Sequence, residues 1–187
     1  MLKPFKSLIF HCCIASILAS IGWSEDIPKY NRDLFGGWID IDQDCQNTRH
    51  ELLQDLSIST LELSDDGCHV LTGRWYDPYT DQYFLDSKHV DIDHLVPLFY
   101  AWSRGAYAWD SETRQYFAND PKNLFVVEKK TNREKSANGP TTWLPPNIKF
   151  RCEYLLDFQK IVNSYDLKQD SIEKTIISQL QKNYCDF

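Results

Sequence analysis

Four cysteines place the strongest constraint on how this chain can fold. Cys45, Cys68, Cys152 and Cys185 remain once an N-terminal segment that we expect to be removed is set aside. An even number of cysteines in an exported chain favours disulfide bonds. Two such bonds would link parts of the chain that are far apart in the sequence, and they would suit a domain of modest size.

The first 24 residues have the pattern of a secretory signal peptide. Lys3 and Lys6 are followed by an uncharged stretch over 7–23, and Gly22 and Ser24 are small residues at the −3 and −1 positions of a cleavage after Ser24. The apolar stretch is short for a bilayer span and is interrupted by polar residues. We therefore predict a signal peptide over 1–24, a secreted or periplasmic location, and no membrane contact in the mature form.

The remaining chain, 25–187, is long enough for a single domain with its own core. The sequence has 20 basic and 27 acidic residues, a net charge of −7. Lys3 and Lys6 are the only charged residues in the predicted signal peptide, so cleavage leaves 18 basic against 27 acidic residues, a net charge of −9. Such a surface does not attract nucleic acid as a whole. We expect a monomer.

Local patterns predict a mixture of helices and strands. Alternating residues on either side of "DDG" predict a β-hairpin, with strands near 58–63 and 68–75. "DPYTD" has the composition of a turn, and Pro97 marks the start of a helix. Helices are also expected over 47–56, in "SETRQYF" and over 129–138, and strands over 88–93 and 123–127.

The C-terminal part predicts an antiparallel pair of helices. Residues 148–165 and 171–184 carry apolar side chains at helical spacing, and "SYDLKQD" joins them. Cys152 lies near the start of the first helix and Cys185 at the end of the second, so arms of similar length bring them together. This predicts Cys152–Cys185 and, by elimination, Cys45–Cys68. Each bond would contribute about 2–4 kcal/mol to stability.

One apolar segment carries charge where a buried strand is expected. "VDIDHLVPL" (90–98) contains Asp91, Asp93 and His94, and burying charge without a partner is costly. Downstream, Asn123 opens a predicted strand and Asn132 lies nine residues later on a predicted helix. The order is therefore a strand ending in Asp-His, an inserted helical stretch, a strand with Asn and a helix with Asn.

This order resembles the ββα-metal fold of the HNH endonucleases, and "DIDHLVP", "KNLFVV" and "TNREKS" carry the resemblance. The chain is similar to the HNH domain of CRISPR effector nucleases. It is more similar to a secreted HNH family related to the C-terminal domain of modification-dependent restriction endonucleases, which shares "FANDPKNL"-like and "WLPPN"-like segments and the cysteine positions. The resemblance implies an α+β fold: a ββα-metal (HNH) nuclease core with an N-terminal hairpin and a C-terminal helical hairpin.

The resemblance also implies roles for individual residues. His94 matches the general base that takes a proton from water, and Asp93 matches a metal ligand. Asn132 stands where many relatives carry the last His of the motif, and would bind the metal through its amide oxygen. Asn123 matches the middle Asn, a catalytic-motif position that orients the His strand. Oxygen ligands favour Mg²⁺, with Mn²⁺ as the alternative, over Zn²⁺.

Further residues near the motif are weaker candidates. Asp91 shares a strand face with Asp93 and could help to hold the ion, or it could be a solvated strand residue. A run of basic residues flanks the motif and favours contact with phosphate over a purely solvated face. Arg133 and Lys135 are the best candidates in this run, which also contains Lys122, Lys129 and Lys130.

A second group of residues resembles a calcium loop. Asp40, Asp42, Asp44 and Glu51 occupy positions 1, 3, 5 and 12 of such a loop, but Cys45 stands at the sixth position, where glycine is needed. A helix capped near Asp44 or Asn47 is the alternative that we favour. Zinc binding by Cys45, His50, Cys68 and His69 is disfavoured in an exported chain, where a disulfide is expected.

The sequence thus predicts an exported, metal-dependent HNH endonuclease that hydrolyses DNA, or RNA, with little sequence specificity. A non-catalytic, disulfide-stapled extracellular binding module is the alternative, favoured by the aromatic content and the negative charge. The feature that discriminates between them is the set Asp93, His94, Asn123 and Asn132, which a binding module does not need.

Overall fold

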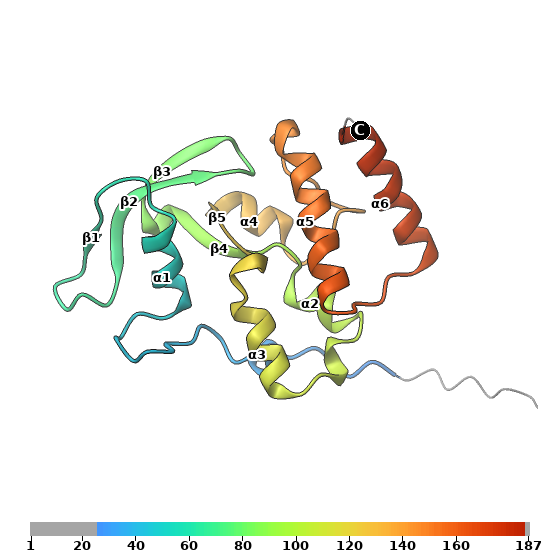
Figure 1. The fold of residues 1–187 in the computed structure, drawn as a ribbon, viewed down its shortest axis with the longest axis horizontal. Helices are drawn as coiled ribbons and strands as arrows, with labels where there is room; N and C mark the ends of the chain where they lie inside the picture. Colours follow the sequence, from blue (N-terminus) through green and yellow to red (C-terminus); the bar gives the residue numbers. More distant parts are fainter. Residues whose placement is uncertain (1–25, 186–187) are drawn as a thin grey trace, which may run out of the picture.

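The computed structural model describes residues 26–185, so the predicted signal peptide lies outside the described residues. Helices and strands are mixed along the chain, which confirms the predicted α+β class. A three-stranded sheet forms one end of the molecule and a pair of helices the other, with a two-stranded sheet between them (Figure 1). Within 26–185, no helix is both long and apolar enough to cross a membrane.

The three-stranded sheet consists of β1 (Glu62–Leu63), β2 (Val70–Asp77) and β3 (Gln82–Asp86), in that order and antiparallel. The predicted hairpin around "DDG" is confirmed, although its first strand is only two residues long. The sequence does not predict β3. Tyr83, Phe84 and Leu85 are apolar residues in succession, so the segment lacks the apolar–polar alternation of a half-buried strand, and none of its side chains is fully buried.

Helix α1 (Thr48–Asp55) packs on β2 and confirms the helix predicted over 47–56. The Asn47 side chain caps it by accepting a hydrogen bond from the Arg49 backbone N–H. Asn47, one of the two candidate caps, is thus the residue that starts the helix.

The two-stranded sheet pairs β4 (Val90–His94) with β5 (Leu124–Glu128) in antiparallel register. Helix α4 (Lys129–Lys135) follows β5 directly and packs against both strands. It ends three residues earlier than predicted because Ser136 has a left-handed φ of 52°. The strands predicted over 88–93 and 123–127 are confirmed within two residues.

Adjacent positions of β4 point to opposite sides of this sheet. Asp93 stands opposite Phe125, which packs on the main core, whereas His94 stands opposite Leu124, which belongs to a second, smaller core. The end of β4 therefore separates the two residues to which the motif assigns the metal and the proton transfer. Whether they meet again depends on the segments that surround the strand end.

The connection from β4 to β5 contains two helices. Helix α2 (Leu98–Trp102) begins just after Pro97, and α3 (Ser111–Asn119) is capped by the Asp110 carboxylate, which accepts from the Thr113 backbone N–H. Both helices were predicted. Short 3₁₀ turns complete the connections: η1 (Arg32–Phe35), η2 (Ser87–His89), η3 (Ala106–Ala108), η4 (Pro121–Asn123) and η5 (Ile148–Phe150).

Helices α5 (Arg151–Ser164) and α6 (Ser171–Tyr184) form the predicted C-terminal hairpin. The structure contains both predicted disulfides: Cys152–Cys185, with its Cα atoms 5.0 Å apart, and Cys45–Cys68, with its Cα atoms 5.2 Å apart. The first bond closes the open end of the helical hairpin. The second links the loop before α1 to the β1–β2 hairpin.

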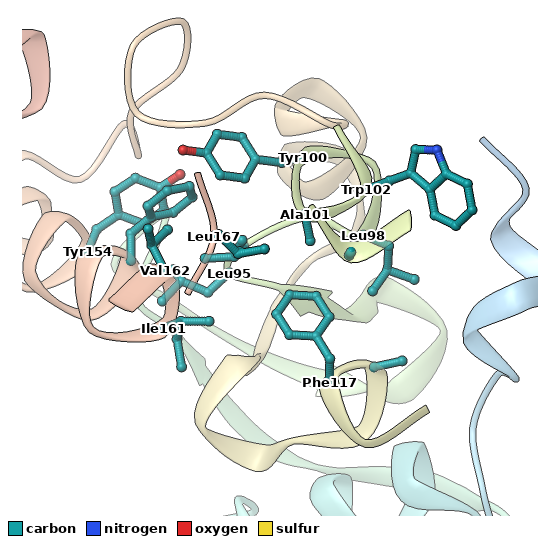
Figure 2. Close-up of a cluster of buried hydrophobic side chains, with 14 of the residues drawn as sticks. Leu95, Leu98, Tyr100, Ala101, Trp102, Phe117, Tyr154, Ile161, Val162 and Leu167 are labelled. Carbon is teal, nitrogen blue, oxygen red and sulfur yellow. The ribbon is translucent and has the colours of Figure 1, made fainter. Parts of the chain in front are cut away.

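The main core lies between α2, α3 and α5 and is rich in aromatic side chains (Figure 2). Tyr154 and Ile161 of α5 approach it from one side and Phe117 of α3 from another. The second core joins α1, β2 and the outer face of the two-stranded sheet, with Trp75 and Leu53 fully buried. The end of β4 is therefore held between two cores.

Candidate active site

His94 ends β4 and is 7% exposed. Its Nε2 atom lies 2.8 Å from the backbone oxygen of Ala118, at the end of α3. A carbonyl oxygen can only accept a hydrogen bond, so Nε2 must carry the proton, and Nδ1 keeps its lone pair. The Trp38 indole stacks on the imidazole, with ring centroids 5.2 Å apart and planes 3° from parallel.

Burial lowers the pKa of His94 to about 3. The hydrogen bond to Ala118 opposes this shift, and the positive charges of Arg32 and Lys135 add to it. Because the pKa lies far below neutrality, the imidazole is uncharged at neutral pH. An uncharged imidazole with Nδ1 unprotonated is the form that can accept a proton.

Asp93 is 5% exposed and forms an ion pair inside the protein. The Lys135 ammonium lies 3.1 Å from its Oδ1 and 2.8 Å from its Oδ2, and the Tyr79 hydroxyl donates to Oδ2 at 2.7 Å. Burial raises the pKa of the carboxyl group, and the charge of Lys135 opposes that shift. Asp93 is thus held by two donors from separate parts of the chain.

Lys135 occupies a different place from the one the sequence predicts. It is 0% exposed, and its ammonium donates to the backbone oxygen of His94 at 2.8 Å as well as to the Asp93 carboxylate. We therefore correct its assignment as a phosphate contact, because an ammonium enclosed by these partners does not face a nucleic acid. Lys135 instead ties the last turn of α4 to the end of β4.

Asn123 is fully buried and fastens the chain just after His94. Its Oδ1 accepts from the Val96 backbone N–H at 2.8 Å, and its Nδ2 donates to the Val96 oxygen at 3.2 Å. Its own backbone oxygen accepts from the Leu95 N–H at 2.8 Å. These contacts tie Asn123 to the segment that follows His94, and burial keeps its side chain away from any substrate.

Asn132 lies on α4 beside the end of β4. Its Nδ2 donates to Asp91 at 3.3 Å, which leaves its carbonyl oxygen as an acceptor. Asn132, Asp93 and His94 line the same cavity, of about 330 Å³. The predicted base and both predicted ligands thus line one cavity, although the Asp93 and His94 side chains point to opposite sides of the sheet, and Asp91 lies next to Asn132.

Arg133 is exposed on a different side of α4. It lines a separate cavity of about 540 Å³ together with Lys88, Lys129 and Lys130. Glu128 and Glu134 line the same cavity, so the area carries both signs with an excess of positive charge. Arg133 lines neither of the two described cavities that contain His94.

Sequence analysis missed two side chains of the site, Arg32 and Trp38. Both precede α1 and lie more than fifty residues from His94 in the sequence, yet they line a cavity of about 290 Å³ with His94 and Ala118. The segment "YNRDLFGGW" could have indicated them, because aromatic residues and paired glycines outside a regular element suggest a loop that packs on the domain.

The acidic loop before α1 brings Asp40, Asp42 and Asp44 together, with one carboxylate oxygen of each within 4.8 Å of the others. All three side chains are exposed. The Asp40 carboxylate accepts from the backbone N–H groups of Gln43 and Cys45, so it stabilises the loop itself. Burial and the negative charges of Asp42, Asp44 and Asp40 raise the pKa of Glu51, so the fourth residue of the set lies near the other three.

The zinc alternative is excluded by the disulfide, which consumes the sulfur atoms of Cys45 and Cys68. The remaining two residues of that set, His50 and His69, stack on each other with ring centroids 4.9 Å apart. His50 Nδ1 also accepts a hydrogen bond from the Val70 backbone N–H. The disulfide, the ring stacking and this hydrogen bond account for the positions of Cys45, Cys68, His50 and His69.

The class of the protein follows from comparison with known families. Residues 46–185 match the family model described as the C-terminal domain of GmrSD restriction endonucleases, so the chain belongs to this family. The resemblance found in the sequence is thereby confirmed.

Among individual proteins, the chain is similar to one from Arthroderma benhamiae named "Uncharacterized secreted protein". The two are 37% identical over 153 residues, which cover 81% of this chain and 74% of the relative. No solved structure matches the chain significantly. The two disulfides and this secreted relative both fit an extracellular location.

Proposed function

We propose that this protein is a secreted, metal-dependent endonuclease that hydrolyses phosphodiester bonds in DNA, and in RNA as a second substrate, with little sequence specificity. One observation carries the proposal: Asp93, His94 and Asn132 surround a single cavity on a β4–β5–α4 unit, in a chain of a restriction endonuclease family. That unit has the strand–strand–helix order of a ββα-metal core. The mature protein would be one domain over 25–187.

His94 would act as the general base through Nδ1. Its Nε2–H is held by the Ala118 carbonyl, so the ring is fixed in the tautomer that leaves Nδ1 available. Stacking on Trp38 restrains the ring further. A positioned base of this kind contributes roughly 10²–10⁴-fold to a rate.

Asp93 and Asn132 would hold the metal. A carboxylate offers about four acceptor sites, and Lys135 and Tyr79 occupy three of them through the bonds described above, which leaves room for one ligand bond. The amide oxygen of Asn132 is a second hard ligand, so the donor set fits Mg²⁺ or Mn²⁺. When bound, such an ion supplies positive charge that stabilises the phosphate and the leaving oxygen. Asp91 would support the site by holding the Asn132 amide.

The test is incubation of supercoiled plasmid with the protein in Mg²⁺, in Mn²⁺ and in excess chelator, followed by gel electrophoresis. We expect nicking and linearisation with either metal and none with chelator. In the same assay, His94→Ala should cleave more slowly than the unaltered protein. His89→Ala is its matched control, since His89 is an exposed histidine just before β4 that lines a different cavity. No cleavage by the unaltered protein would contradict the proposal and favour a binding module. Full activity in chelator would contradict the metal assignment.

A further inference from the structure

The segment 28–38, called here the N-terminal strap, precedes the region matched by the family, 46–185, but packs against the candidate site. In Figure 1 it is the blue part of the chain that runs past α2 and α3. The strap is fixed to the family domain by hydrogen bonds. Trp102 Nε1 donates to the Pro28 oxygen at 2.7 Å, and Asn119 Nδ2 donates to the Gly37 oxygen at 3.0 Å.

Packing and backbone conformation fix the course of the strap further. Phe35 is fully buried between Phe117 and Trp102. Gly36 follows it with a left-handed φ of 82°, and a Cβ at this position would lie 2.8 Å from Gln115 Nε2. The left-handed φ favours glycine at this position. The strap is therefore held in one path across the site.

This path brings Arg32 to the mouth of the site. Arg32 lines both cavities that contain His94, one of about 290 Å³ and the other of about 330 Å³. It is the only Lys or Arg among the described residues that line them. It is exposed, and none of the ion pairs between described residues includes it.

Apart from the metal ion proposed above, a phosphodiester that approached His94 would meet no accessible cationic side chain other than Arg32 among the described residues that line the cavity. The Lys135 ammonium is enclosed and paired with Asp93, and Asp33 on the strap adds a negative charge. A guanidinium presents several N–H donors in one plane and matches two phosphate oxygens at once. The accessible cation at this position is therefore suited to the one anion that the reaction requires.

We propose that Arg32 binds a phosphate of the nucleic acid at the active site, so that the strap adds an accessible basic side chain beside the metal ion that the family domain would hold. This inference rests on the proposed nuclease function. It assigns to the strap a part in substrate binding that lies outside the HNH motif.

The experiment compares Arg32→Gln with Lys29→Gln in the full chain. Lys29 is an exposed cation on the same strap that lines neither cavity, so both variants lose the same charge. With plasmid DNA and Mg²⁺, we expect Arg32→Gln to lower kcat/KM at least ~10-fold, a modest value for a donor aimed at a reacting phosphate. Lys29→Gln should stay within about 2-fold, as expected for a cation outside the site.

Two further measurements separate binding from a structural role. The first is the affinity for a short DNA duplex, measured in chelator by fluorescence anisotropy at several salt concentrations. The slope of log binding constant against log salt should be less steep by about 0.9 for Arg32→Gln, as expected for one lost phosphate contact. Added guanidinium ion should restore part of the cleavage rate of Arg32→Ala and should not affect Lys29→Ala. The melting temperature of both Gln variants should match that of the unaltered protein, because the side chains are exposed.

The outcomes are distinguishable. If the unaltered protein cleaves and Arg32→Gln behaves like Lys29→Gln, the assignment of Arg32 is wrong and the proposed function stands. If the unaltered protein neither cleaves nor binds DNA, both are wrong. A selective loss in Arg32→Gln with a guanidinium response supports the assignment.

Discussion

The ion pair between Asp93 and Lys135 allows a quantitative test, because both partners are almost completely buried. Lys135→Met removes the ammonium and keeps most of the side-chain volume. The carboxylate then retains the Tyr79 hydroxyl as its donor but loses its counter-charge. Removing one partner of a buried pair costs about 3–5 kcal/mol. We expect Lys135→Met to lower the free energy of unfolding by this amount.

The assay is urea unfolding at 25 °C with disulfides intact and chelator present. Lys130→Met is the matched control, since Lys130 is an exposed cation on the same helix whose pairing with Glu134 at 3.8 Å contributes about 0.5 kcal/mol or less. The double variant Asp93→Asn with Lys135→Met should recover at least about half of the loss, because it removes the buried charge as well.

The pH dependence of this loss follows from the direction of the pKa shift. Burial raises the pKa of Asp93 and Lys135 lowers it, so without Lys135 the folded-state pKa rises further above the unfolded value. The folded variant then binds a proton that the unfolded chain releases, and its stability falls as the pH rises through that range.

The other titratable groups facing Asp93 are Asp91 and two tyrosines, Tyr79 and Tyr154. Burial holds the pKa of both tyrosines well above the usual range, so they stay protonated. The destabilisation should therefore be larger at pH 8 than at pH 5. A loss below about 1 kcal/mol at pH 8, or equal losses for Lys130→Met, would refute a structural ion pair at this position.

Three further outcomes are expected. Replacing Cys152 and Cys185 together by Ser should lower the free energy of unfolding in urea by about 3–4 kcal/mol, because the disulfide closes a loop between residues 33 positions apart. A change near zero would contradict a disulfide that restrains the unfolded chain. Asn123→Ala should lower the free energy of unfolding by at least about 2 kcal/mol, because it leaves the buried backbone N–H and C=O of Val96 unpaired, and it should also slow cleavage. Leu85→Ala, at an exposed position, should change neither. Binding of duplex DNA in chelator should show a log–log salt slope of only about −2 to −4, and a slope near −10 would reveal a much larger basic surface.

Local sequence patterns were sufficient to predict a helix or strand wherever one face of the element is clearly apolar or where a helix cap is present. Residues 171–184 show helical spacing, and the helix has these bounds in the structure. The pairing of Cys152 with Cys185 follows because two helices of similar length place their ends together. β3 has no such pattern, since Tyr83, Phe84 and Leu85 are apolar in succession and Tyr83 and Leu85 are exposed.

The site could be predicted only in part, because its motif is local but its surroundings are not. Asp93, His94 and Asn132 are recognisable from spacing and meet at one cavity. The inward position of Lys135 was not recognisable, since "KKTNREK" is polar all round and only the Asp93 carboxylate on β4 determines which side chain turns in. Trp38 reaches His94 through contacts between the strap and α3, which join residues about eighty positions apart.

The central claim is that His94 is the general base of a metal-dependent nuclease, and the single-turnover rate of plasmid cleavage by His94→Ala tests it most directly. The variant should cleave at least ~10²-fold more slowly than the unaltered protein in saturating Mg²⁺, because the metal ligands remain but the proton acceptor is gone. Cleavage by His94→Ala at the rate of the unaltered protein would contradict the account.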